Sequence, residues 1–197
     1  MNTTTRIFLA ALLGAIAMFA WTAIAHMALP LGEAGVQNTR DDEALLAAMK
    51  TNVKDKDGLY TYPSMGLGPD ATHAQQSAAM EKFAAKLETN PSGFFLYHPA
   101  GSRPMAMGKF LTIEFITELI EAFIAVWLLA QTRIVTFGGR IGFVVAIGIL
   151  AAISTNVSYW NWWGFPTVYT ASYMFIQFVG FFLVGLVAAI MFRRVTA

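Results

Sequence analysis

The chain has 197 residues, of which 56% are hydrophobic and 13% are charged, and its formal net charge is +1. This composition is too apolar for an ordinary soluble domain and is typical of a polytopic membrane protein in a lipid bilayer. A charge this close to neutral gives no sign of nucleic-acid binding. The chain has no cysteine, which excludes disulfides, thiol redox chemistry and thiolate metal sites.

Four segments are long enough to cross the hydrocarbon of a bilayer as helices, which takes about 20 apolar residues. They run from about 7 to 29, 110 to 129, 141 to 160 and 169 to 192. We therefore predict an all-α integral membrane protein with four transmembrane helices. Residues 1–30 hold the first, 110–197 hold the other three, and 31–109 form a small α+β insertion outside the membrane.

The basic residues of the short connections orient these helices. They precede the first segment, separate the second from the third, and follow the fourth: Arg6, Arg133, Arg140, Arg193 and Arg194. With four spans these three places lie on one side, which the positive-inside rule assigns to the cytoplasm. We expect both termini to be cytoplasmic and residues 31–109 to lie outside, most simply in a bacterial inner membrane.

The first segment also resembles a secretory signal peptide. Arg6 precedes an apolar run that ends in Ala23-Ile24-Ala25, so cleavage after Ala25 would leave His26 as a new N-terminus. The apolar run is longer than a usual signal core, and Trp21 is uncommon close to such a cleavage site. We therefore expect the segment to remain as a transmembrane helix, with cleavage as the alternative.

The polar insertion reads as two repeats of helix, turn and strand. Helices are expected over about 43–53 and 71–87, and strands over 59–63 and 94–99. A capping box from Thr39 to Asp42 is expected to start the first of these helices. The two halves are about 35 residues apart, which fits either a weak internal duplication or a chance similarity of short elements.

Three glutamates interrupt the second apolar segment. Glu114, Glu118 and Glu121 follow i, i+4, i+7 spacing, which places them on one face of a helix. A charged side chain at the centre of a bilayer costs about 2.5–3.5 kcal/mol on insertion scales, so such residues face other protein or a water-filled cavity. This face is therefore the first candidate for a functional site.

Polar side chains lie at similar depths on the other three helices. At about 1.5 Å per residue, His26 is level with Glu114 and Thr22 with Glu118. The third helix has Ser154, Ser158 and Asn161 at helical spacing, and the fourth has Tyr169, Tyr173 and Gln177. We expect these stripes to meet along the bundle axis, in the outer half of the bilayer. The predicted binding set is Glu114, Glu118, Glu121, His26, Thr22, Tyr173 and Gln177.

This set favours a protein that binds or conducts a proton, a cation or a cationic ligand. One alternative is an accessory subunit, in a larger membrane complex or a homo-oligomer, whose glutamates pair with basic residues of a partner helix. Another is a membrane metalloenzyme with a metal ion held by His26, Glu114 and Glu118. The chain contains no GxSxG, Walker, HExxH or EF-hand motif, so no catalytic residue is assigned and an enzyme is less favoured. Glutamates that only join the helices are the remaining interpretation.

Overall fold

The computed structural model describes residues 2–53 and 55–193. The chain divides into two units, a helical unit formed by Met1–Gln37 and Ala106–Ala197, and a smaller unit formed by Asn38–Met105. Six helices and one two-stranded sheet lie within the described residues. Arg194, one of the basic residues used to orient the chain, lies outside them.

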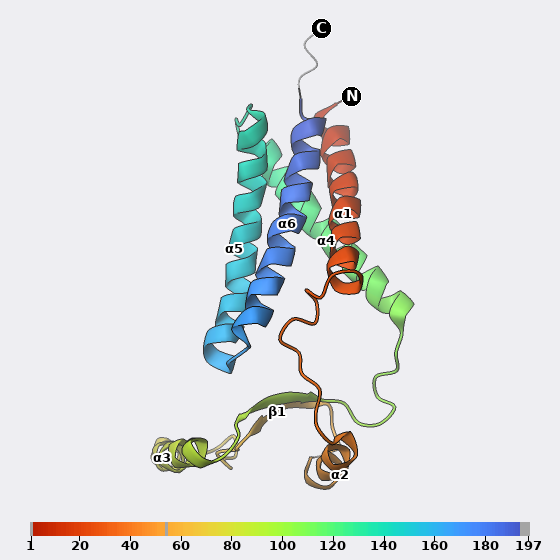
Figure 1. Cartoon of the computed structure of the whole chain (residues 1–197). Helices are drawn as coiled ribbons and strands as arrows, with labels where there is room; N and C mark the ends of the chain where they lie inside the picture. Colours follow the sequence, from red (N-terminus) through yellow and green to blue (C-terminus); the bar gives the residue numbers. More distant parts are fainter. Residues whose placement is uncertain (1, 54, 194–197) are drawn as a thin grey trace. The chain divides into compact units, whose positions relative to one another are not determined.

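The helical unit contains α1 (Thr3–Met27), α4 (Met107–Ala130), α5 (Phe137–Trp163) and α6 (Thr167–Met191) (Figure 1). Each corresponds to one of the predicted apolar segments. Two of them begin at side-chain caps, because Asn2 accepts a hydrogen bond from the backbone of Thr5 at 2.8 Å and Thr136 from that of Gly139 at 3.2 Å. The suspected cleavage site, residues 23–25, lies within α1.

Within the described residues, three helices are long and apolar enough to cross a membrane: α1, α5 and α6. They indicate a membrane protein. The fourth helix, α4, is of similar length, at 24 residues. It is not counted among the apolar spans because Glu114, Glu118 and Glu121 interrupt its apolar run. The prediction of four apolar spans is therefore confirmed for three.

Small residues determine how these helices pack. α6 packs along both α1 and α5, and α4 packs mainly on α1. The buried stripe of α5 consists of Val144, Gly148 and Ala152. A Cβ atom at Gly148 would lie 2.5 Å from the Cβ of Phe181 on α6, so the missing side chain lets the two helices approach closely. This contact fixes which face of α5 is turned towards α6.

The smaller unit contains α2 (Asp42–Asn52), β1 (Gly58–Tyr62), α3 (His73–Thr89) and β2 (Gly93–Tyr97). The helix–strand order is as predicted, and the strands pair antiparallel with Tyr60 opposite Phe95. The predicted capping box at Thr39 is wrong. Asp41 caps α2 instead, by accepting from the backbone of Ala44, so Thr39 precedes the cap. The capping box is found at the start of α3, between Thr72 and Gln75.

A cluster of side chains links the two strands at the end of the sheet where β1 begins and β2 ends. Asp57 precedes β1 and His98 follows β2, and His98 Nδ1 lies 3.0 Å from Asp57 Oδ1. Ser102 donates to the same oxygen at 3.1 Å, and Arg103 donates to His98 Nε2 at 3.0 Å. The hydrogen bond with His98 holds the pKa of the Asp57 carboxyl below its ordinary value. None of the described residues of this unit is fully buried, so contacts at the strand ends matter more than a core.

The close approach at Gly148 can be tested with a matched pair of substitutions in α5. In Gly148→Ala the new methyl group meets Phe181, and we expect a loss of about 1–3 kcal/mol in the free energy of unfolding. Gly142→Ala makes the same change where a Cβ meets nothing within 4 Å, and it should be neutral or slightly stabilising. Thermal unfolding in mild detergent measures both, and equal midpoints would contradict the packing described.

Candidate functional site

The contact between α1 and α4 buries one of the three glutamates. Glu118 is 3% exposed, and Thr22 Oγ1 donates a hydrogen bond of 2.7 Å to its Oε1. Its second oxygen, Oε2, is also buried and has no hydrogen-bond partner within the described residues. A buried polar atom without a partner carries a desolvation cost of about 1–3 kcal/mol. Glu118 therefore presents one fixed and one unpaired carboxyl oxygen in the interior.

Two aromatic ring pairs also hold α1 and α4 together, and both use residues that precede Thr22 on α1. Phe19 meets Phe115 edge-on at a ring distance of 5.5 Å, and Phe8 lies 5.4 Å from Phe123 further along the pair. The two contacts follow opposite directions along the helices, because Phe8 precedes Phe19 on α1 whereas Phe123 follows Phe115 on α4. They help to fix the register in which Thr22 meets Glu118. Edge-on and tilted ring contacts of this kind add to the apolar burial of the contact.

The other two glutamates lie on either side of Glu118 along α4. Glu114 is exposed and Glu121 is partly buried, and the three carboxyls are close enough for their charges to interact. The three glutamates form a line of carboxyls along α4 whose burial differs, because Glu118 in the middle is buried while Glu114 is exposed and Glu121 is partly buried.

His26 and Tyr173 form a second part of the predicted set, where α1 ends. The ring of His26 meets that of Tyr173 edge-on at a centroid distance of 5.8 Å. Tyr173 donates to the carbonyl of Gly32 at 3.4 Å, and a Cβ at Gly32 would collide with the His26 ring. The turn that follows α1 therefore packs directly on the imidazole, and any side chain at position 32 would have to displace the ring.

Thr22 connects this cluster to the buried carboxyl. Its hydroxyl donates to Glu118, and its backbone carbonyl lies 2.9 Å from His26 Nδ1. A carbonyl oxygen only accepts, so His26 must donate from Nδ1, and Nε2 is then the nitrogen that can take up a proton. The structure thus places Thr22, His26, Tyr173 and Glu118 in one neighbourhood, and Glu114 lies one turn before Glu118 on α4.

Gln177, one helical turn after Tyr173 on α6, makes its side-chain hydrogen bond to α5. Its side-chain oxygen accepts a hydrogen bond of 3.0 Å from Asn156 of α5, and Asn156 also donates to the carbonyl of Ala152. Asn156 was missed in the sequence analysis. Its position four residues after Ala152, in a series with Val144 and Gly148, would have placed it on the buried stripe of α5.

The predicted polar stripe of α5 faces the wrong way for a common site. Ser154, Ser158 and Asn161 are exposed, so the expectation that they turn towards the bundle axis is wrong. The reason is the contact of Gly148 with Phe181, which turns the stripe of small residues towards α6 and leaves the serines on another flank. The predicted polar stripe of α5 is therefore uncovered, and the four polar stripes do not meet on one axis.

The predicted metal ligands are not brought together. Within the described residues no three or more histidine, aspartate or glutamate side chains are placed so that they could hold a metal ion. His26, Glu114 and Glu118 are included in that statement, so no geometric observation supports a metal at this site. Glu118 keeps the chemistry of a carboxyl with one unpaired oxygen, which can take up a proton, a cation or a hydrogen-bond donor.

Comparison of the chain with protein-family models, with curated proteins and with solved structures finds no match. The site must therefore be interpreted from its own geometry.

The contribution of the Thr22 hydroxyl can be measured directly. Thr22→Val keeps the shape of the side chain but leaves both oxygens of Glu118 without a partner, and we expect a loss of about 1–3 kcal/mol in the free energy of unfolding. Thr117→Val is the matched control, because the Thr117 hydroxyl only donates to the carbonyl of Ile113 in its own helix. That change should stay within about 0.5 kcal/mol.

Denaturation in mild detergent gives both values. Equal effects of the two substitutions would show that the hydrogen bond to Glu118 contributes nothing specific.

Proposed function

We propose that this chain is a small polytopic membrane protein that binds or conducts a proton or a cation at the glutamates of α4. The observation that carries the proposal is the buried Glu118, with Oε1 held by Thr22 and Oε2 without a partner within the described residues. An ionised carboxylate is costly in a low-dielectric interior unless a positive charge compensates it. Uptake of a proton, a cation or a cationic ligand satisfies the unpaired oxygen.

In this proposal α4 crosses the bilayer beside α1, α5 and α6. Its 24 residues are about 36 Å long, enough for hydrocarbon about 30 Å thick. Packing against α1 removes the buried Glu118 from lipid. With four spans, Arg6, Arg133 and Arg193 lie on one side, so both termini are cytoplasmic and residues 31–109 are outside. A bacterial inner membrane is the simplest location.

In this proposal the order of the line of carboxyls along α4 sets the direction in which an ion enters the site. Glu114 lies seven residues into α4 and is exposed, Glu118 follows one turn deeper, and Glu121 another three residues on. His26 lies near the same end of the site, with Nε2 able to take up a proton. A proton or cation entering from outside would therefore meet Glu114 and His26 before Glu118. Tyr173 acts as a positioning residue, because its ring packs on His26.

The flux through purified protein in synthetic lipid vesicles tests this function. An imposed gradient of H⁺, Na⁺ or K⁺ is applied and its decay followed with an internal dye. We expect wild-type protein to dissipate at least one gradient and Glu118→Gln to lower that rate about tenfold or more, because a neutral amide neither takes up a proton nor supplies the negative charge that attracts a cation. Glu88→Gln, at the end of α3, is the matched control and should keep the wild-type rate. A wild-type rate that survives Glu118→Gln would overturn conduction through this site.

An accessory subunit is the second candidate, favoured by the exposure of Glu114 on a helix proposed to lie in lipid. An exposed carboxylate at that depth needs a basic group from another protein. Purification in mild detergent would then retain a fixed partner with wild-type protein and lose it with Glu114→Gln. Recovery of the chain without any stoichiometric partner would speak against this role.

A further inference from the structure

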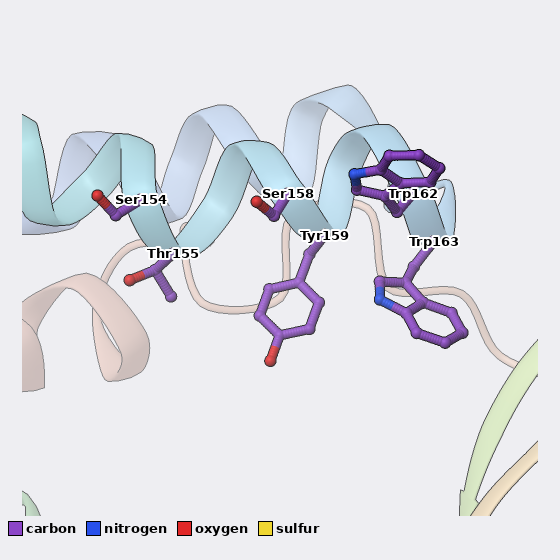
Figure 2. Close-up of a pocket in the computed structure, with 6 residues that line it drawn as sticks. All are labelled: Ser154, Thr155, Ser158, Tyr159, Trp162 and Trp163. Carbon is purple, nitrogen blue, oxygen red and sulfur yellow. The ribbon is translucent and has the colours of Figure 1, made fainter.

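One flank of α5 carries hydroxyl groups that the helical unit does not cover. Ser154, Thr155 and Ser158 are exposed, and with Tyr159, Trp162 and Trp163 they line an open hollow. All six side chains come from α5 itself, and the two tryptophans lie at its C-terminal end (Figure 2). Ser154 and Ser158 lie on a different side of the helix from Ala152, the nearest member of the buried stripe of Val144, Gly148 and Ala152. The two serines of this hydroxyl flank are thus separate from the contact with α6.

The depth of the hydroxyl flank follows from the tryptophans. Tryptophan prefers the level of the lipid headgroups, and Ser154 precedes Trp162 by eight residues, or about 12 Å along the helix. Ser154 and Thr155 therefore lie within the hydrocarbon when α5 spans the bilayer, as its length and hydropathy indicate. Lipid chains offer no hydrogen-bond partner to a hydroxyl at that depth.

The three hydroxyls are also unpaired inside the chain. Thr112 and Thr117 of α4 donate to carbonyl oxygens four residues earlier, at 2.8 and 2.9 Å. Within the described residues, no hydrogen bond of this or any other kind is made by the side chains of Ser154, Thr155 and Ser158. All three hydroxyls thus lack a partner on the protein side, and Ser154 and Thr155 also lack one on the lipid side.

We propose that the hydroxyl flank of α5 packs against the same flank of a second copy of this chain. A hydroxyl both donates and accepts, so this surface is complementary to itself, whereas a surface of carboxylates alone would repel its copy. Two copies in one membrane share their orientation, so a two-fold axis along the membrane normal brings each serine of one α5 to the same serine of the other. Ser154 and Ser158 are small and one turn apart, which allows the helices to approach closely.

Exposed apolar residues extend this contact along α5. Leu150, Ile153 and Val157 are all exposed in the single chain and lie on the same part of the helix as the serines, so they would pack around the hydroxyl contacts. The proposal uses only α5, which is one of the three helices apolar enough to span the membrane. It does not depend on the glutamate site, so a result that overturns the proposed ion binding leaves the proposed dimer unaffected. The reverse also holds.

The chain has no cysteine, so single cysteines report this contact without background. Ser154→Cys and Ser158→Cys are introduced separately into the full chain, and membranes are treated with a mild oxidant. We expect a disulfide-linked homodimer, because thiols of facing helices come within bonding range when their Cα atoms are closer than about 7 Å. Ile116→Cys and Ile120→Cys, exposed on α4, are the controls and should stay monomeric.

A second variant separates the contact from chance collisions in the membrane. Replacing Ser154 and Ser158 by leucine leaves the single chain intact, because both side chains are exposed, and the larger side chains keep the two helices apart. We expect loss of the dimer in mild detergent, measured by light scattering. A wild-type protein that is monomeric there, equal cross-linking from α4 and α5, or a cross-link to a different protein would each overturn the proposal.

Discussion

The hydrogen bond from Thr22 to Glu118 is the interaction on which the rest of the site depends. It joins α1 to α4, the one long helix whose charges keep it from qualifying as an apolar span. Packing on α1 buries the Glu118 side chain, and the Thr22 hydroxyl gives only one of its two carboxyl oxygens a hydrogen bond. The stability of the helical unit and the chemistry of the carboxyl are therefore linked. Any ligand that pairs with the second oxygen also strengthens the contact between the two helices.

Small residues control how α5 is oriented against α6. Gly148 admits Phe181, and a Cβ at Gly185 would come within 3.2 Å of the backbone of Ile141, so α5 lies close against α6 along one stripe. The polar contacts follow from that arrangement. Asn156 reaches Gln177 because it continues the buried stripe, and Ser154 stays outside because it does not. One packing contact thus explains both the hydrogen bond between α5 and α6 and the uncovered hydroxyl flank.

The sequence was sufficient to predict the helices, the two strands of the insertion, and the neighbourhood of Thr22, His26 and Glu118. Apolar length and helical spacing carry that information directly. Spacing also fixes the angle between residues of one helix, but it leaves the rotation of the helix about its own axis open. For this reason spacing alone predicts the stripe containing Ser154 inside and gives no separate sign of Asn156. The start of α2 shows a related limit, because Thr39 and Asp41 are both good capping side chains two residues apart and only Asp41 caps the helix.

Infrared difference spectroscopy of the purified protein tests the central claim most directly, because it observes the carboxyl of Glu118 itself. Spectra are recorded as the sample is titrated with acid and then with a monovalent cation. The account predicts a carboxyl or carboxylate signal that responds to at least one of these ligands. This signal should shift in Thr22→Val, vanish in Glu118→Gln and persist in Glu88→Gln. Identical difference spectra for the wild-type protein and Glu118→Gln would contradict the account, because Glu118 would then take up neither ligand.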